Sequence, residues 1–186
     1  MTAERARRDI LSRLRKFRSD CRGVSAVEFA FILPVMLSLY LGGVEVGDGF
    51  AIDTRVTLVA RSLTDLATQY VTIDNQDMSN ILNASATIIA PYASANITAT
   101  VSEVTTDNNG NGTITWSDSL NGTARTVGSA ITLPASLKIP NTTMILGEVS
   151  YNYNPALGYA ITGTIKMSDS FYMLPRLSNS VTRVNS

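Results

Sequence analysis

The chain has no histidine and a single cysteine, Cys21, among its 186 residues. Without histidine it can form neither a Ser–His–acid catalytic triad nor a histidine metal site. One cysteine cannot close a disulfide within the chain. A glycine-rich phosphate-binding motif is also missing. These absences exclude common hydrolase and nucleotide-binding chemistries, so we expect no enzyme activity, no cofactor and no metal.

Charge is scarce and unevenly placed. Only 16% of the residues are charged, and 15 basic residues balance 15 acidic ones. Residues 1–22, however, hold eight Lys or Arg against Glu4, Asp9 and Asp20. A basic flank beside an apolar span stays in the cytoplasm, so membrane topology explains this segment. A nucleic-acid site would need further assumptions, and we expect no nucleic-acid partner.

The longest apolar run extends from Val24 to Val46 and contains four polar residues: Ser25, Glu28, Ser38 and Glu45. A run of about 20 apolar residues crosses a bilayer as one helix. We therefore predict a single-pass membrane protein with its N-terminus in the cytoplasm and its C-terminal domain across the membrane. The predicted segments are residues 1–23, a basic leader; 24–47, the membrane helix; and 48–186, an exported domain.

Glu28 is energetically unfavourable at this place in a membrane helix. A carboxylate inside a membrane helix costs about 2.5–3.5 kcal/mol at mid-bilayer and less near the interface, and it needs a partner. Cleavage after Gly23 would give Val24 a new ammonium group, with a pKa near ~7.7–8. In a stack of helices, that ammonium could pair with the Glu28 carboxylate of a neighbour and lower the desolvation cost of both ions.

The segment Gly23 to Phe29, with sequence GVSAVEF, resembles the processing site of type IV prepilins: glycine, four residues, glutamate, aromatic. Its continuation to Gly47, with Pro34 in the apolar run, is similar to the TadE-like pseudopilins of tight-adherence (Tad/Flp) pili. The short major pilins of that system usually have tyrosine after the glutamate, whereas this longer chain has Phe29. The resemblance therefore favours a minor pseudopilin.

The resemblance implies cleavage at Gly23–Val24 by a prepilin peptidase, and subunit assembly through Glu28 and Phe29. It also implies a location in the bacterial inner membrane or on the pilus. The implied partners are that peptidase, other Tad minor pseudopilins, the major pilin and the inner-membrane assembly platform. Two C-terminal fragments, Tyr151 to Pro155 and Met173 to Arg176, resemble TadE-like signatures. The alternative is an unprocessed, anchored periplasmic binding or adhesion module.

Beyond Gly47 the apolar residues recur every three or four positions, which predicts a helix at about 48–70. They are Ile52, Val56, Val59, Leu63, Leu66 and Tyr70. We expect this stripe to pack on the protein's own sheet. A second helix at about 75–90 would be capped by Asp74 or Asn75. Strand patterns follow from about 95 to 172. The predicted fold is pilin-like α+β: a long N-terminal transmembrane helix, a small helix and an antiparallel β-sheet domain.

The segment from Asp107 to Asp118 has the spacing of a calcium loop, with Asp107, Asn109, Asn111 and Asp118 as candidate ligands. Its flanks read as strands rather than helices, and only two of the ligands carry charge. An Asn/Gly hairpin turn accounts for the same residues without metal, and we favour that interpretation.

Two further groups have no single interpretation. The aromatic residues near the C-terminus could contact a partner, but core packing and cross-strand pairing are the simpler explanation. They are Tyr151, Tyr153, Tyr159, Phe171 and Tyr172. Arg176 could pair with a helix acid such as Asp65 or bind a neighbouring pseudopilin, and the sequence does not decide between these.

Overall fold

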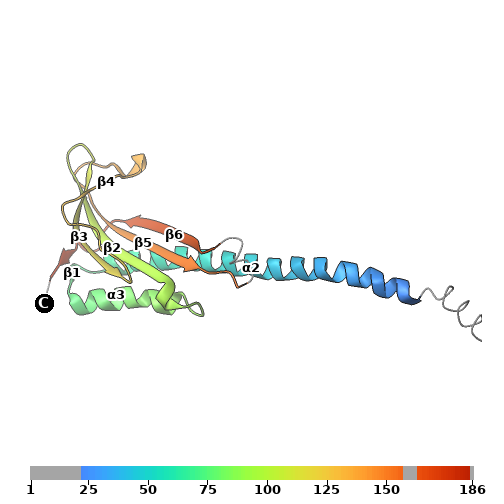
Figure 1. Ribbon diagram of the computed structural model, residues 1–186. Coiled ribbons are helices and arrows are strands. Elements are labelled where there is room, and N and C mark those ends of the chain that lie inside the picture. Colours follow the sequence, from blue (N-terminus) through green and yellow to red (C-terminus); the bar gives the residue numbers. More distant parts are fainter. Residues whose placement is uncertain (1–21, 157–162, 185–186) are drawn as a thin grey trace, which may run out of the picture. The chain divides into compact units, whose positions relative to one another are not determined.

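The computed structural model describes residues 22–156 and 163–184 (Figure 1). The chain divides into two compact units between Val44 and Glu45. This division falls inside one helix, α2, which extends from Arg22 to Thr68. The predicted leader, apart from its last two residues, and Cys21 lie outside the described residues.

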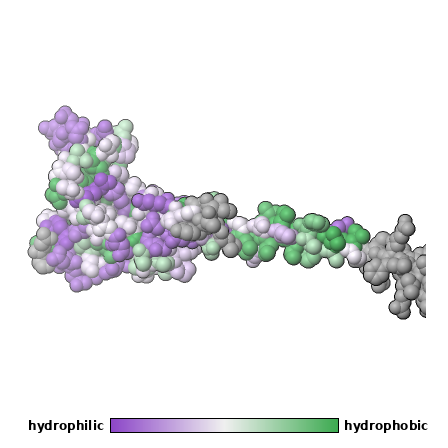
Figure 2. All heavy atoms as spheres, in the orientation of Figure 1, coloured by the Kyte–Doolittle hydropathy of each residue, from purple (hydrophilic) through white to green (hydrophobic). Residues whose placement is uncertain are grey.

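The part of α2 before Glu45 is an apolar rod. Nearly all of its described side chains are exposed, and Figure 2 shows hydrophobic residues covering most of its visible surface. Pro34 lies inside the helix, and the Ser38 hydroxyl donates to the Pro34 carbonyl at 2.7 Å. That bond keeps one of the few hydroxyls satisfied within the helix. A helix that is apolar all round is suited to lipid rather than to water.

The unit from Glu45 onward is a mixed α+β domain. Its sheet has five strands in the order β4-β3-β2-β5-β6, and every neighbouring pair is antiparallel. A second, two-stranded sheet pairs β1 with β7 in parallel. The bounds are β1 Thr72–Ile73, α3 Asn75–Ile88, η1 Ser94–Asn96, β2 Ile97–Thr106, β3 Gly112–Leu120, β4 Ala130–Ile131, η2 Ala135–Leu137, β5 Thr143–Tyr153, β6 Ile165–Met173 and β7 Thr182–Arg183.

The predicted fold class is confirmed: a long apolar helix, a small helix and an antiparallel sheet follow one another along the chain. Asp74 caps α3, because its side chain accepts the Asp77 backbone N–H at 2.7 Å. The expected hairpin joins β2 to β3, and its register shifts between Glu103 and Val104.

The last long strand, β6, begins at Ile165 and ends at Met173, close to the predicted end of the strand patterns at 172; residues 157–162 lie outside the described part of the chain. Gly163 precedes the strand with a φ of 66°, a left-handed conformation that breaks an extended segment. The short strands β1 and β7 were not predicted, because two residues cannot show an alternating pattern.

The sheet buries apolar side chains on both faces. One face packs against α3 and the second half of α2, where the predicted stripe residues Ile52, Val56, Val59 and Leu63 are fully buried. The other face carries a smaller core beneath the segment from β4 to η2. That core consists of Val104, Ile114, Leu133, Met144 and Leu146. The stripe therefore packs on the protein's own sheet, as expected.

Gly147 sets how closely α2 approaches β5. A Cβ atom at this position would overlap Thr64 Oγ1 and lie 3.0 Å from the Ala60 carbonyl oxygen. The helix backbone and the strand backbone therefore meet without an intervening side chain. Only glycine allows this approach, because any other residue would push the helix off the sheet.

Gly147→Ala should therefore destabilise the domain by about 1–3 kcal/mol, the usual cost of overpacking a core. Chemical unfolding of the full chain in detergent micelles measures this loss. Adding Thr64→Ala should recover part of it, since it removes one of the two clashing atoms. Gly49→Ala is the control, because its Cβ would make only ordinary contacts of 3.6 Å or more. Equal stability of the Gly147 and Gly49 variants would contradict the close approach.

Candidate functional site

The candidate processing motif lies near the start of α2. Gly23, Val24, Glu28 and Phe29 are all exposed and helical, and nothing lies within 4 Å of a Cβ built on Gly23. Val24 and Glu28 are four positions apart, so they lie on the same helix face. Cleavage after Gly23 and the assembly role of Glu28 and Phe29 remain predictions.

The helix that carries this motif is long and apolar enough to cross a membrane, by length and composition. It is the one such helix among the described residues. Large apolar side chains such as Phe31, Leu39 and Tyr40 are exposed along it. A single-pass membrane protein with a C-terminal domain fits this arrangement.

The four candidate calcium ligands are not brought together. Asp107 Oδ1 accepts the backbone N–H groups of Asn109 and Asn111, each at 2.8 Å, which is the hydrogen bonding of a turn. Asp118 lies in β3, about 20 Å along the strand from Gly112 at 3.3 Å per residue. Its carboxylate binds Arg183 instead. The calcium-loop spacing was therefore misleading, because the residues after Gly112 are extended rather than wrapped around a centre.

Two arginines of the C-terminal segment form ion pairs with other parts of the domain. Arg176 forms an ion pair with Asp65 of α2, and its backbone N–H donates to the Thr68 carbonyl at 2.9 Å. Arg183 pairs with Asp118 at 2.9 Å. Of the two interpretations of Arg176, the structure shows the intramolecular pair. The Pro-Arg fragment thus contacts the C-terminal end of α2 through both its side chain and its backbone.

Of the five aromatic residues near the C-terminus, Tyr159 lies outside the described residues. Tyr151 is buried and meets Tyr92 edge to face, with ring centroids 6.5 Å apart. The Tyr153 hydroxyl donates to the Glu45 carbonyl at 3.4 Å, and burial raises the pKa of this phenol. Phe171 and Tyr172 are half-buried against the two cores. The four described aromatics therefore pack within the domain.

A buried carboxylate, Glu103, was missed in the sequence. It is 3% exposed, and its Oε1 accepts the Val181 backbone N–H at 2.7 Å. The Trp116 indole N–H donates to the Val181 carbonyl, also at 2.7 Å. Burial raises the pKa of the Glu103 carboxyl above its usual value. The sequence did contain a sign of this: Glu103 follows Ile97, Ala99 and Val101 at every second position, where an inward-facing apolar residue is expected.

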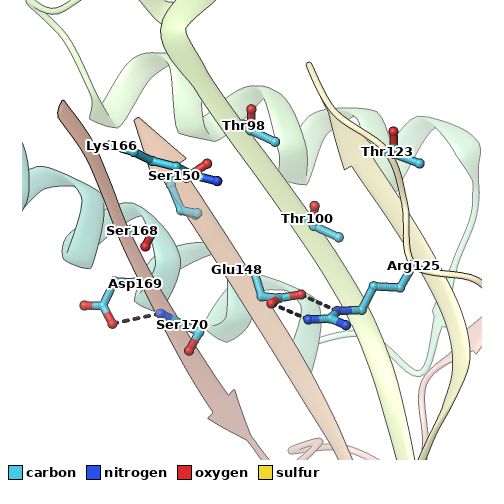
Figure 3. Close-up of a pocket in the computed structure, with 11 residues that line it drawn as sticks. Thr98, Thr100, Thr123, Arg125, Glu148, Ser150, Lys166, Ser168, Asp169 and Ser170 are labelled. Atoms are coloured by element: carbon cyan, nitrogen blue, oxygen red, sulfur yellow. Dashed lines mark hydrogen bonds and ion pairs between the residues drawn. The ribbon is translucent and has the colours of Figure 1, made fainter. Parts of the chain in front are cut away.

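The open half of the outer sheet face is a polar groove of about 490 Å³. Figure 3 shows its hydroxyl lining and, at one end, Arg125 reaching Glu148. The guanidinium donates to both carboxylate oxygens, at 2.6 and 2.7 Å, and this pairing raises the pKa of Arg125. Thr100 and Ser119 bond each other across β2 and β3 at 3.0 Å. The groove is thus a surface rich in hydrogen-bonding groups beside the edge strand β6.

Comparison with known proteins identifies one family. Residues 23–63 match the family described as TadE-like protein, which confirms the resemblance inferred from the GVSAVEF motif over that segment. The match covers the apolar part of α2 and the first part of its buried stripe. No curated protein and no solved structure gave a significant match to the chain.

Glu103→Gln should change how stability depends on pH. Because the folded pKa is raised, Glu103 contributes stability below its unfolded pKa near ~4.3, and that contribution is lost as pH rises through the folded value. The neutral amide should therefore gain stability relative to the natural chain between pH 4.5 and 7.5. Thermal unfolding of both full chains across this range measures the difference.

Asp107→Asn provides a control of opposite sign. Hydrogen bonds from Asn111 lower the pKa of Asp107, so its contribution is present at neutral pH and lost as pH falls. This variant should lose stability relative to the natural chain as pH rises. Parallel curves for the two variants would contradict the assignment of Glu103 as a buried acid with a raised pKa.

Proposed function

We propose that the protein is a minor pseudopilin that primes or joins assembly of a Tad-type pilus after processing by a prepilin peptidase. Cleavage after Gly23 removes the basic leader and leaves Val24 as the first residue. The apolar part of α2 then holds the subunit in the bacterial inner membrane, with the domain on the periplasmic side. The same helix enters the fibre with other minor pseudopilins and the major pilin, on the inner-membrane assembly platform.

One observation carries this proposal: an exposed carboxylate, Glu28, stands in an apolar helix five residues after Gly23, inside the segment that matches TadE-like proteins. Within the described residues before Glu45 it is the only acidic side chain. A lone acid on a lipid-facing helix is a functional residue by default and requires a partner. The Val24 ammonium of an adjacent, processed subunit supplies that positive charge.

The chemistry follows from desolvation. A carboxylate and an ammonium each lose hydration in an apolar environment, and each compensates the other only when they meet in good geometry. Since Val24 and Glu28 are one helical turn apart, a small axial offset between neighbouring helices would bring the ammonium of one to the carboxylate of the next. The pair would therefore set the axial register of subunits as well as their attraction.

Gly23→Leu should leave the protein at precursor length, because a bulky side chain obstructs a protease that approaches the backbone. Gly43→Leu is the matched control, since it makes the same change in the same helix where no atom lies within 4 Å of the added Cβ. Immunoblotting of membranes from cells with the peptidase measures both lengths. Normal shortening of the Gly23 variant would contradict cleavage at this bond.

Glu28→Gln should permit cleavage yet reduce assembled fibre at least about tenfold, because it leaves the Val24 ammonium without its partner, a loss of about 3–5 kcal/mol for a desolvated pair. Glu28→Asp keeps the charge and should retain part of the assembly. Fibre is measured in the sheared fraction, and processing by mass spectrometry of membranes. Full fibre yield from the Gln variant would rule out charge pairing.

A further inference from the structure

The strand β6 forms an open edge of the five-stranded sheet. No strand of the described residues pairs with its outer side. The opposite edge differs, because it ends in the two-residue strand β4, which pairs with the start of β3. Beside β4, the Ile114 N–H donates to the Ser129 carbonyl at 3.0 Å, and the Gly128 N–H donates to the Ile114 carbonyl at 2.8 Å. The nine-residue strand β6 is therefore the longer edge strand of this sheet.

One hydrogen bond shows which backbone groups of β6 point outward. The Ser170 N–H donates to Oδ1 of Asp169 at 2.8 Å, and Figure 3 shows this carboxylate on the side of β6 away from β5. The Ser170 N–H therefore faces the open edge. Because backbone groups alternate along an antiparallel strand, those of Lys166, Ser168 and Tyr172 also face outward. Four successive edge positions are thus available to another strand.

The edge carries one charge of each sign. Lys166 is exposed and Asp169 is half-buried, and neither forms an ion pair within the described residues. They are three positions apart, so they lie on opposite faces of the sheet. Asp169 is on the face toward α2, where its Oδ2 accepts the Thr57 hydroxyl at 2.6 Å. Lys166 lines the polar groove together with Ser168 and Ser170.

We infer that β6 binds an extended segment of a different protein, which adds a sixth strand to the sheet. Every existing pair in this sheet is antiparallel, so the added strand is antiparallel as well. Charge complementarity then places a basic residue opposite Asp169 and an acidic residue opposite Lys166. In an antiparallel segment the basic residue precedes the acidic one by three positions. Its remaining side chains alternate between apolar and polar.

A second copy of this chain is a poor occupant. Full overlap of the nine-residue strand β6 with its own antiparallel copy is centred on Asp169 and places two carboxylates directly opposite each other. Like charges in that position destabilise a strand pair. The other edge of a second copy is the two-residue strand β4, which is too short to form an extended ladder with β6. The edge therefore discriminates against self-association and favours a partner with a cation at this position.

Asp169 also protects the edge in the absence of a partner. Its carboxylate accepts the Ser170 N–H, which is then not free to bond another strand. A charged side chain at an edge strand also disfavours non-specific pairing with other strands. A basic residue on an incoming strand draws the carboxylate to itself and frees that N–H for the new ladder. Polar side chains on the other face of the segment meet the groove hydroxyls of Ser168 and Ser170. This recognition does not depend on processing at Gly23.

The test uses the full chain in detergent micelles and a fluorescent, end-capped peptide of sequence VTVTKTVEV. In antiparallel register its lysine faces Asp169 and its glutamate faces Lys166. Anisotropy titration should show binding at least threefold tighter than for VTVTETVKV, which has the same composition with the charges exchanged. N-methylation of the third threonine, whose N–H faces β6, should abolish binding. N-methylation of the lysine, whose N–H faces away, should not.

Lys166→Glu completes the design, because it alters an exposed side chain without changing the strand backbone. The variant should bind VTVTKTVEV more weakly and VTVTKTVKV more tightly than the natural chain does. The difference between these two effects measures the interaction between residue 166 and the eighth residue of the peptide. Circular dichroism confirms that the variant is folded. Absence of binding, equal affinity for the charge-exchanged peptides, or equal sensitivity to the two N-methyl positions would each overturn the inference. Because recognition at β6 does not require cleavage after Gly23, these outcomes test the inference independently of the proposed function.

Discussion

A carboxylate on a lipid-facing helix is the constraint on which this account depends. Glu28 stands in an apolar run where almost every side chain is exposed, and inside a bilayer a carboxylate at this place is costly unless a cation pairs with it. The chain holds many basic residues before Gly23, but cleavage would remove them. In the proposed function, the new ammonium at Val24, one helical turn from the acid, would take their place. Processing, membrane retention and polymerisation would then be parts of one electrostatic arrangement.

The same helix performs a second task beyond Glu45. There its stripe of Ile52, Val56, Val59 and Leu63 is buried against the sheet, and Gly147 lets the backbone of β5 approach it closely. The segment after the membrane span is thus an integral part of the domain core rather than a linker. The C-terminal segment ties the end of this helix through Arg176 and Asp65.

Local patterns predicted the features that local sequence controls. The apolar run, the buried stripe, the Asp74 cap and the hairpin after Thr106 all depend on residues close in sequence. The features that were missed depend on distant partners: Glu103 meets Val181, Arg125 meets Glu148, and Arg183 meets Asp118. The calcium-loop spacing failed for the same reason, because strand pairing holds Asp118 in an extended conformation. Only the strand order shows that Lys166 and Asp169 lie on an edge strand.

The N-terminal residue of the natural protein in assembling cells tests the central claim most directly. Mass spectrometry of the chain purified from inner membranes and from sheared fibres reads this residue without any substitution. We predict a chain that begins at Val24 with a free ammonium group in both fractions. A chain that retains the segment from Met1 to Gly23 in normal fibres, or that carries an acylated Val24, would contradict it.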